Sequence, residues 1–299
     1  MLCPECVLYT SFETFVSRFI NPPTRQTTCL TVKDIDMTQL SKGTALVTGA
    51  SSGIGAVYAD RLARQGYDLI LVARSQSRLN ALADTLSNET GRTVTVLAAD
   101  LKDKADLLRV ENVLRSDPSI TLLVNNAGVG AVMPLLDSPV DEMEDMVALN
   151  VTALMRLAYA AVPGFVARGE GTVINISSIV AIAPEILNGV YGGTKAFVLG
   201  FSQSLHHELA DKGVRVQAVL PGATATEFWN VAGHPVENLP QSIVMSAEDM
   251  VDAALVGLSN GEWVTIPGLH EGDKWARFET QRQELSGLMG NSTPATRYQ

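Results

Sequence analysis

Short apolar runs alternate along the chain with longer stretches of helical periodicity. The runs are rich in β-branched residues and have the length of buried strands: 44–48, 68–73, 93–98, 120–124, 171–176 and 214–220. Gly66 stands where the first helix should end. Ser138–Asp141 has capping-box character, with proline at the first helical position, and predicts the start of a long helix towards Pro163 and Gly164. This alternation predicts an α/β fold, a single Rossmann-type doubly wound parallel sheet with helices on both faces and a ligand at the carboxyl ends of its strands.

Charge and composition limit the partners. The 299 residues include 22 basic and 32 acidic side chains, and no basic cluster is interleaved with aromatics, so the sequence gives no reason to expect a nucleic-acid partner. The longest hydrophobic runs are broken by Gly, Asn or charged residues within a few positions. We therefore expect no membrane span and a cytoplasmic protein.

The cysteines lie before the first strand. Cys3 and Cys6 have the spacing of a metal knuckle, but Cys29 is the only other cysteine and the first histidine is His206. We therefore expect reduced thiols and no metal site.

The first 40 residues differ from the rest of the chain. They show no clear period and contain the breaker pair Pro22–Pro23. No basic segment leads a continuous apolar core, and Glu5 and Glu13 disfavour a transit peptide. We expect a poorly ordered extension over 1–40, a Rossmann-fold domain over 41–270 and a C-terminal tail over 271–299.

A glycine-rich turn follows the first apolar run. Gly49, Gly53 and Gly55 stand directly after the 44–48 run and before a helical pattern. Strand, glycine turn and helix in this order open a dinucleotide-binding unit, because the glycines let a pyrophosphate approach the positive end of the helix. The spacing is G-x-x-x-G-x-G rather than the G-x-G-x-x-G of the broader fingerprint, so a purely structural turn stays open at this point.

Tyr191 and Lys195 form a candidate proton-transfer pair. Four positions apart on an expected helix, they share one face, and Ser178 precedes Tyr191 by thirteen positions. An ammonium beside a phenol favours the phenolate, which makes the phenol a proton donor and acceptor usable near neutral pH. The Y-x-x-x-K pattern alone occurs often by chance, but here it accompanies the glycine turn.

With these motifs the chain resembles the short-chain dehydrogenases/reductases. The matching positions, in the family's order and near its spacings, are Thr48-Gly49-x-x-x-Gly53-Ile-Gly55, Asp100, Asn125-Asn-Ala-Gly128, Asn150, Ser178, Tyr191, Lys195 and Pro221-Gly222. The resemblance extends from about Lys42 to about Pro267. It implies an NADP(H)-dependent oxidoreductase that interconverts a carbonyl and an alcohol.

The resemblance implies a role for each catalytic position. Tyr191 would be the general acid/base, and Ser178 would hydrogen-bond the substrate oxygen and stabilise charge that builds on it. Lys195 would hold the nicotinamide ribose and lower the pKa of Tyr191. Asn150 would position a water that connects Lys195 to solvent.

The same resemblance implies cofactor contacts along the strand ends. The residues that would face the phosphates, adenine, ribose and nicotinamide are Gly49, Ser51, Ser52, Gly53, Ile54, Gly55, Arg74, Asp100, Leu101, Asn126, Ala127, Gly128, Tyr191, Lys195, Pro221, Gly222 and Thr224. Asn126 to Gly128 could instead brace the sheet.

Arg74 decides the expected nicotinamide cofactor. The second strand ends at Arg74, with Arg78 a turn later and no carboxylate for the ribose hydroxyls. A guanidinium opposite a 2′-phosphate forms a charge-assisted contact and favours NADP(H). Ser52 occupies a position that is basic in some NADP-binding members, so the preference depends mainly on Arg74.

The substrate segments are less specific. We expect 225–245 to form a lid over the pocket and 180–188 its opposite wall. Phe228 and Trp229 favour an apolar carbonyl or alcohol substrate, although lid aromatics equally serve packing. The tail aromatics could pack on the domain or on a second subunit, and we expect a homodimer or homotetramer.

Two other functions fit parts of the sequence. One is a catalytically silent NADP-binding sensor or scaffold on the same fold. Such a protein would be expected to lose its catalytic residues, but Asn150, Ser178, Tyr191 and Lys195 are all present. The sugar-nucleotide epimerases and dehydratases share Y-x-x-x-K, but their glycine turn is spaced differently and their substrate domain is longer.

A chain that starts at Met37 should fold and turn over as the full chain does, because residues 1–36 lack caps, periodicity and any matched motif. Thermal unfolding and cofactor titration of both chains check this. Weaker cofactor binding or a lower Tm in the shorter chain would show that these residues pack on the domain.

Overall fold

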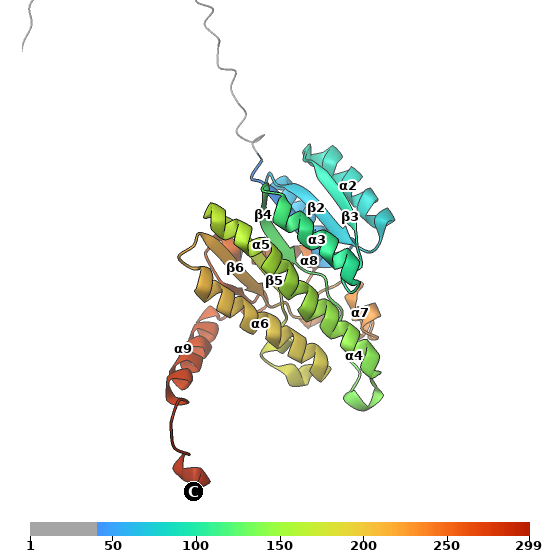
Figure 1. The fold of residues 1–299 in the computed structure, drawn as a ribbon. Coiled ribbons are helices and arrows are strands. Elements are labelled where there is room, and N and C mark those ends of the chain that lie inside the picture. Colours follow the sequence, from blue (N-terminus) through green and yellow to red (C-terminus); the bar gives the residue numbers. More distant parts are fainter. Residues whose placement is uncertain (1–40) are drawn as a thin grey trace, which may run out of the picture. The chain divides into compact units, whose positions relative to one another are not determined.

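The computed structural model describes residues 41–299, so the expected N-terminal extension, its cysteines and Met37 lie outside the described residues. The described strands form one parallel sheet of seven strands in the order β3-β2-β1-β4-β5-β6-β7 (Figure 1). They are β1 (Thr44–Thr48), β2 (Asp68–Ala73), β3 (Val94–Ala98), β4 (Ile120–Asn125), β5 (Gly171–Ile176), β6 (Val214–Val219) and β7 (Val264–Thr265). The predicted fold class is confirmed.

The direction of winding reverses at β1. This strand pairs with β2 on one side, Thr48 opposite Val72, and with β4 on the other, Val47 opposite Val124. The chain runs outward to β3 first and then crosses back over the sheet to β4. Such a switch point leaves a crevice at the carboxyl ends of the strands, where doubly wound proteins bind their ligands.

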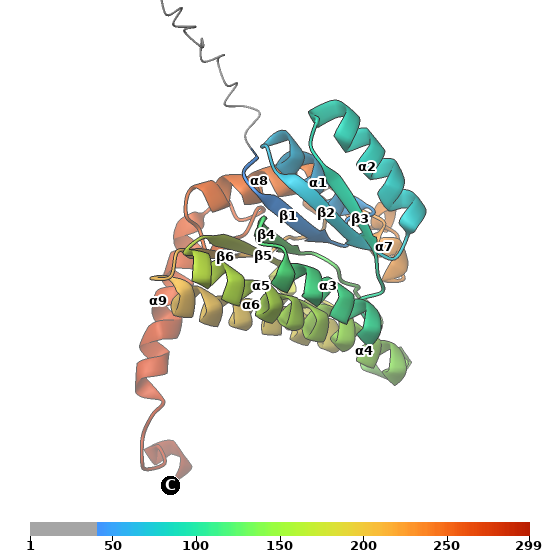
Figure 2. The same cartoon turned by 45° about the horizontal axis from the view of Figure 1, so that its top comes forward.

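Helices cover both faces of the sheet (Figure 2). One apolar core packs α1, α2 and α8 on the first face, and a second packs α3, α5 and α6 on the other. The helices are α1 (Gly53–Arg64), α2 (Gln76–Thr90), α3 (Lys104–Ser116), α4 (Val140–Val147), α5 (Leu154–Arg168), α6 (Gly189–Leu209), α7 (Phe228–Val231), α8 (Ala247–Ser259) and α9 (Gly272–Leu288). The tail expected over 271–299 therefore contains a helix, α9.

The long helix begins differently from the expectation. Pro139 is the N-cap of α4, and no side chain caps that end. The Ser138 hydroxyl instead donates to the carbonyl oxygens of Met133 (3.1 Å) and Pro134 (2.9 Å). The predicted capping box is wrong because this serine closes the preceding turn.

The same helix also runs further than expected. A π-helical segment, Ala148–Ala153, joins α4 to α5. Pro163 lies inside α5, which ends only at Gly169, where φ is +67°. Burial of Leu157 and Phe165 stabilises this helix and offsets the hydrogen bond that Pro163 cannot make.

The α4–α5 segment is also apolar. Among the described helices, Val140–Arg168 alone has the length and composition of a membrane span, with 29 residues and a hydropathy of 1.4. Sequence analysis did not single it out, because Asn150 and charged residues interrupt its apolar runs. Within its most apolar window, 44% is buried in the protein, and its α5 part contributes to the core between α3 and α6. Packing in the protein core therefore accounts for the apolar residues on the buried face of this helix.

Candidate active site

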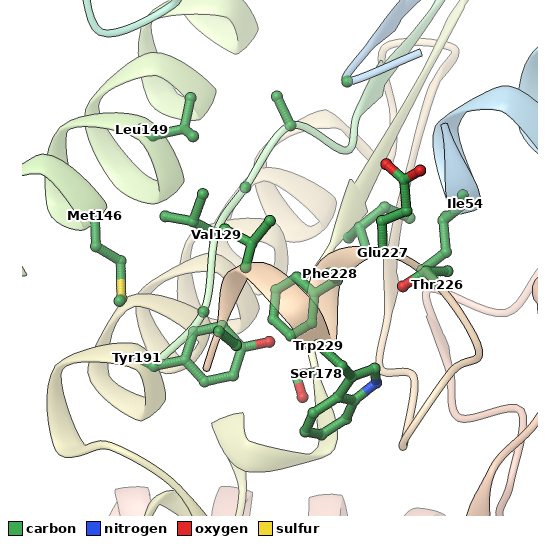
Figure 3. Close-up of a pocket in the computed structure, with 18 of the residues that line it drawn as sticks. Ile54, Val129, Met146, Leu149, Ser178, Tyr191, Thr226, Glu227, Phe228 and Trp229 are labelled. Atoms are coloured by element: carbon green, nitrogen blue, oxygen red, sulfur yellow. The ribbon is translucent and has the colours of Figure 1, made fainter. Parts of the chain in front are cut away.

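A cavity of about 1140 Å³ lies at the carboxyl ends of the strands (Figure 3). Its walls come from the β1–α1 turn, the ends of β2 to β5, the start of α6 and the segment after β6. All the predicted site residues line it except Gly55 and Asn150. The fold therefore gathers groups that are far apart in the sequence.

The β1–α1 turn offers an anion-binding helix end. Gly49 and Gly53 have φ values of +66° and +52°, which favour glycine. Ser52 is the N-cap of α1, but its side chain caps none of the first N–H groups. These groups therefore remain as donors for an anion in the cavity, and they suit the phosphates of a dinucleotide.

Gly55 has a packing role behind this turn. A methyl group added at Gly55 would lie 2.3 Å from the carbonyl oxygen of Gly49, so a larger residue would push the turn off α1. The absence of a side chain here allows the helix to approach the strand closely.

Asn126 holds the turn against β4. Its Nδ2 donates to the carbonyl oxygens of Thr48 (2.9 Å) and Gly49 (3.3 Å). The Thr48 hydroxyl in return accepts from the backbone N–H groups of Asn126 (2.9 Å) and Ala127 (3.0 Å). The side-chain amide of Asn126 is thus engaged inside the protein, as the bracing alternative proposed.

Tyr191 and Ser178 share one wall of the cavity. The Asn188 side chain caps α6 by accepting from the N–H groups of Val190 and Tyr191, which fixes Tyr191 in the first turn. The Tyr191 and Ser178 side chains project into the same space (Figure 3). Burial raises the pKa of Tyr191 to about 12, while a hydrogen bond with Ser178 acts in the opposite direction.

Lys195 lies beneath this wall. Its Nζ donates to the carbonyl oxygen of Ile176 at 2.9 Å, and burial lowers the pKa of Lys195 to about 8. Nζ is 5.8 Å from the centroid of the Tyr191 ring. The sequence predicts that Lys195 lowers the pKa of Tyr191, and this effect stays a prediction. Burial, which disfavours the charged form of a side chain, is the main cause of both pKa shifts.

Asn150 lies behind the cavity, in the π-helical segment. Its side chain accepts from the N–H of Val129 (2.9 Å) and donates to the Val129 carbonyl oxygen (2.8 Å) and the Thr194 hydroxyl (3.1 Å). A methyl group added at Gly128 would lie 3.1 Å from Asn150 Oδ1 and 3.7 Å from Lys195 Nζ, so the three groups are close neighbours. In this structure Asn150 positions the loop after β4 that carries Val129.

The segment after β6 adds residues that sequence analysis missed or placed only loosely. Thr226 lines the cavity, and its Cγ2 would be 3.0 Å from a methyl group at Gly53. The Phe228 ring lies 5.8 Å from the Tyr191 ring and fills the space beside Gly130. Thr226 could have been predicted as a cavity residue, because it carries a hydroxyl only two positions after the predicted site residue Thr224. The contact between Phe228 and Tyr191 has no counterpart in the sequence pattern.

Three basic side chains, Arg74, Arg78 and Lys102, line the cavity near the ends of β2 and β3. Arg74 is exposed at the end of β2 and has no hydrogen-bond or ion-pair partner within residues 41–299. Arg78, one turn into α2, pairs with Glu227 at 2.7 Å. Lys102, which sequence analysis did not consider, pairs with Asp145 at 2.6 Å. The exposed Arg74 guanidinium is therefore available to an anionic ligand.

Known proteins resemble this chain over most of its length. The family model described as short chain dehydrogenase matches residues 43–236. A short-chain dehydrogenase from Sphingobium yanoikuyae, solved in complex with NADPH, is 49% identical, covers 86% of this chain and 100% of its own, and superposes with a TM-score of 0.84. A bulky-bulky ketone specific alcohol dehydrogenase from Comamonas testosteroni is 44% identical over 87% of this chain and 99% of its own, with a TM-score of 0.80. The very-long-chain 3-oxoacyl-CoA reductase of Mus musculus is 33% identical over 72% of this chain and 68% of its own.

The buried Lys195 should make stability depend on pH. Its pKa is about 8 in the folded protein and 10.5 ordinarily, so between these values the unfolded chain binds more protons and the free energy of unfolding rises with pH. From pH 7 to 9.5 the gain should be on the order of 2 kcal/mol. Tyr191 acts in the opposite direction only above about pH 10, because its pKa is raised.

Urea unfolding across this pH range, compared with Lys195→Met, measures the effect. The variant keeps an apolar chain of similar length but cannot titrate, so its free energy of unfolding should rise less with pH. Parallel pH profiles for the two proteins would contradict the assignment.

Proposed function

The chain belongs to the short-chain dehydrogenase family and is an oxidoreductase, and from this premise we propose that it interconverts a carbonyl and an alcohol with NADP(H). One observation carries the proposal. The Tyr191 and Ser178 hydroxyls lie in the same cavity as the uncapped end of α1, which suits a pyrophosphate. A dinucleotide held there and a carbonyl at the hydroxyls would share this one cavity.

NADP(H) is the proposed cofactor. Its phosphates would bind at the β1–α1 turn, and its 2′-phosphate would lie at Arg74, beside Ser52. The similar protein from Sphingobium yanoikuyae is in complex with NADPH, which supports the assignment. When bound, the nicotinamide donates or accepts the hydride, and the protein supplies position and a proton.

Tyr191 is proposed as the proton donor in reduction. Its raised pKa keeps the hydroxyl protonated at neutral pH. This proton would pass from Oη to the substrate oxygen as that oxygen gains negative charge, and the Ser178 hydroxyl would stabilise the same charge by donating a hydrogen bond. Lys195, with a pKa of about 8, exchanges protons near neutral pH and would help to restore the proton on Tyr191.

Asn150 is proposed as a positioning residue. Its side chain is engaged by Val129 and Thr194, so it acts on the reaction by holding the loop after β4 in place beside Lys195. The proposed water between Lys195 and solvent would lie in this region.

The proposed substrate is a ketone with large apolar substituents. Met146, Leu149 and Val129 line the cavity on one side of Tyr191, and Phe228 and Trp229 lie on the other (Figure 3). Such a lining binds apolar groups by removing their surface from water. The similar alcohol dehydrogenase from Comamonas testosteroni is named for bulky-bulky ketones, which favours the same class here.

Tyr191→Phe should lower kcat on the best ketone at least a hundredfold, because a positioned acid contributes about 10²–10⁴ in rate. NADPH consumption with a panel of aldehydes, ketones, quinones and β-keto esters identifies the substrate and then measures the loss. Tyr159→Phe removes a hydroxyl from an exposed tyrosine of α5 and serves as the matched control. If Tyr191→Phe bound NADPH normally and kept most of its turnover, the proposed chemistry would be wrong. No turnover by the parent with any carbonyl would favour binding without catalysis.

Arg74→Gln should reduce the preference for NADPH over NADH. The parent should show a higher kcat/KM with NADPH than with NADH. Expressed as a free energy, the ratio of these two kcat/KM values should fall in the variant by about 1–3 kcal/mol, the range of a hydrogen bond to a charged group. Arg215→Gln removes an arginine at the opposite ends of the strands, beside Thr172, and should leave the gap unchanged. Equal efficiency of the parent with both cofactors would contradict the assignment to NADP(H).

A further inference from the structure

An ion pair connects the lid to the rim of the proposed cofactor site. Arg78 lies in the first turn of α2, and Glu227 directly precedes α7 in the segment 225–245. Their side chains meet at 2.7 Å although 149 positions separate them in the chain. This pair therefore ties the start of the lid to the helix that follows β2.

Arg78 belongs to the same rim as Arg74. The two residues are four positions apart, on either side of the α2 N-cap Ser75, and all three residues line the cavity. Arg74 has no partner among the described residues, whereas Arg78 is bound to a carboxylate. The Glu227 carboxylate therefore occupies an arginine of the rim at which the 2′-phosphate of NADP(H) is proposed to bind.

The position of Glu227 is fixed by its neighbours. Thr226 lies against the glycine turn, within 3.0 Å of a methyl group that would stand at Gly53. On the other side, Phe228 packs beside Tyr191, and Trp229 is buried with its Nε1 donating to the Thr224 carbonyl oxygen at 3.0 Å. Figure 3 shows Glu227 on the side of Ile54 and Phe228 on the side of Tyr191. These contacts hold the backbone at Glu227 beside the rim, and the exposed carboxylate reaches Arg78 from there.

We propose that Glu227 competes with the 2′-phosphate of NADP(H) for Arg78, an inference that rests on the proposed function. A guanidinium binds carboxylate and phosphate through the same fork of N–H donors, so Arg78 cannot serve both anions fully. Glu227 thereby weakens the preference for NADPH. Because coupling is reciprocal, the 2′-phosphate in turn loosens the tie between α2 and the lid that carries Phe228 over Tyr191.

The ratio of the Kd for NADH to the Kd for NADPH measures this competition. Isothermal titration of the full chain gives this ratio for the parent, for Glu227→Gln, for Arg78→Gln and for the double variant. Both partners are more than half exposed, so the expected effect is modest. Glu227→Gln should raise the ratio about two- to fivefold, and high salt should diminish the change. Arg78→Gln should lower the ratio below that of the parent.

Glu237→Gln is the matched control. It removes the same charge from an exposed residue of the same lid that does not line the cavity, and should leave the ratio unchanged. In the Arg78→Gln background, Glu227→Gln should no longer raise the ratio.

Three results would overturn the competition while leaving the cofactor assignment in place. In the first, the parent prefers NADPH clearly and Glu227→Gln does not change the ratio. In the second, Glu227→Gln raises the ratio equally in the Arg78→Gln background. In the third, Arg78→Gln has the same ratio as the parent. A ratio near one in the parent would instead overturn the cofactor assignment and this inference with it.

Discussion

The site depends on the contact between the β1–α1 turn and the end of β4. Thr48 and Asn126 exchange hydrogen bonds at the point where the winding of the sheet reverses. Without this contact, the two halves of the sheet would not present their loops to one cavity. The glycines matter for the same reason, because side chains at Gly49 or Gly55 would force the turn away from Asn126.

The segment after β6 connects the two ends of the cavity. In consecutive positions, Thr226 approaches the glycine turn, Glu227 binds Arg78 and Phe228 covers Tyr191. A displacement at the rim with Arg78 would therefore reach the cavity wall with Tyr191 through three consecutive residues. This geometry gives a physical route by which cofactor binding and access of the substrate can influence one another.

Burial controls the charges of Tyr191 and Lys195 at the cavity wall. Tyr191 and Lys195 are both removed from water, and both pKa values shift towards the neutral form. A helical spacing of four residues indicates that two side chains share a face, but it carries no information about how dry that face is. The burial that shifts both pKa values therefore has no signal in the spacing of the two residues.

The sequence by itself determined the fold class, because alternating strand and helix periods allow few arrangements other than a doubly wound parallel sheet. Most of the residues that the sequence assigned to the site line the cavity, since motifs at the carboxyl ends of parallel strands converge at one edge. Only the tertiary structure decided that Pro163 lies within α5, that Gly55 and Asn150 lie behind the cavity, and that Glu227 reaches Arg78. These features depend on contacts between segments distant in the chain, and such contacts leave no local pattern. Packing and desolvation, which set both side-chain partners and pKa values, arise only once the chain is folded.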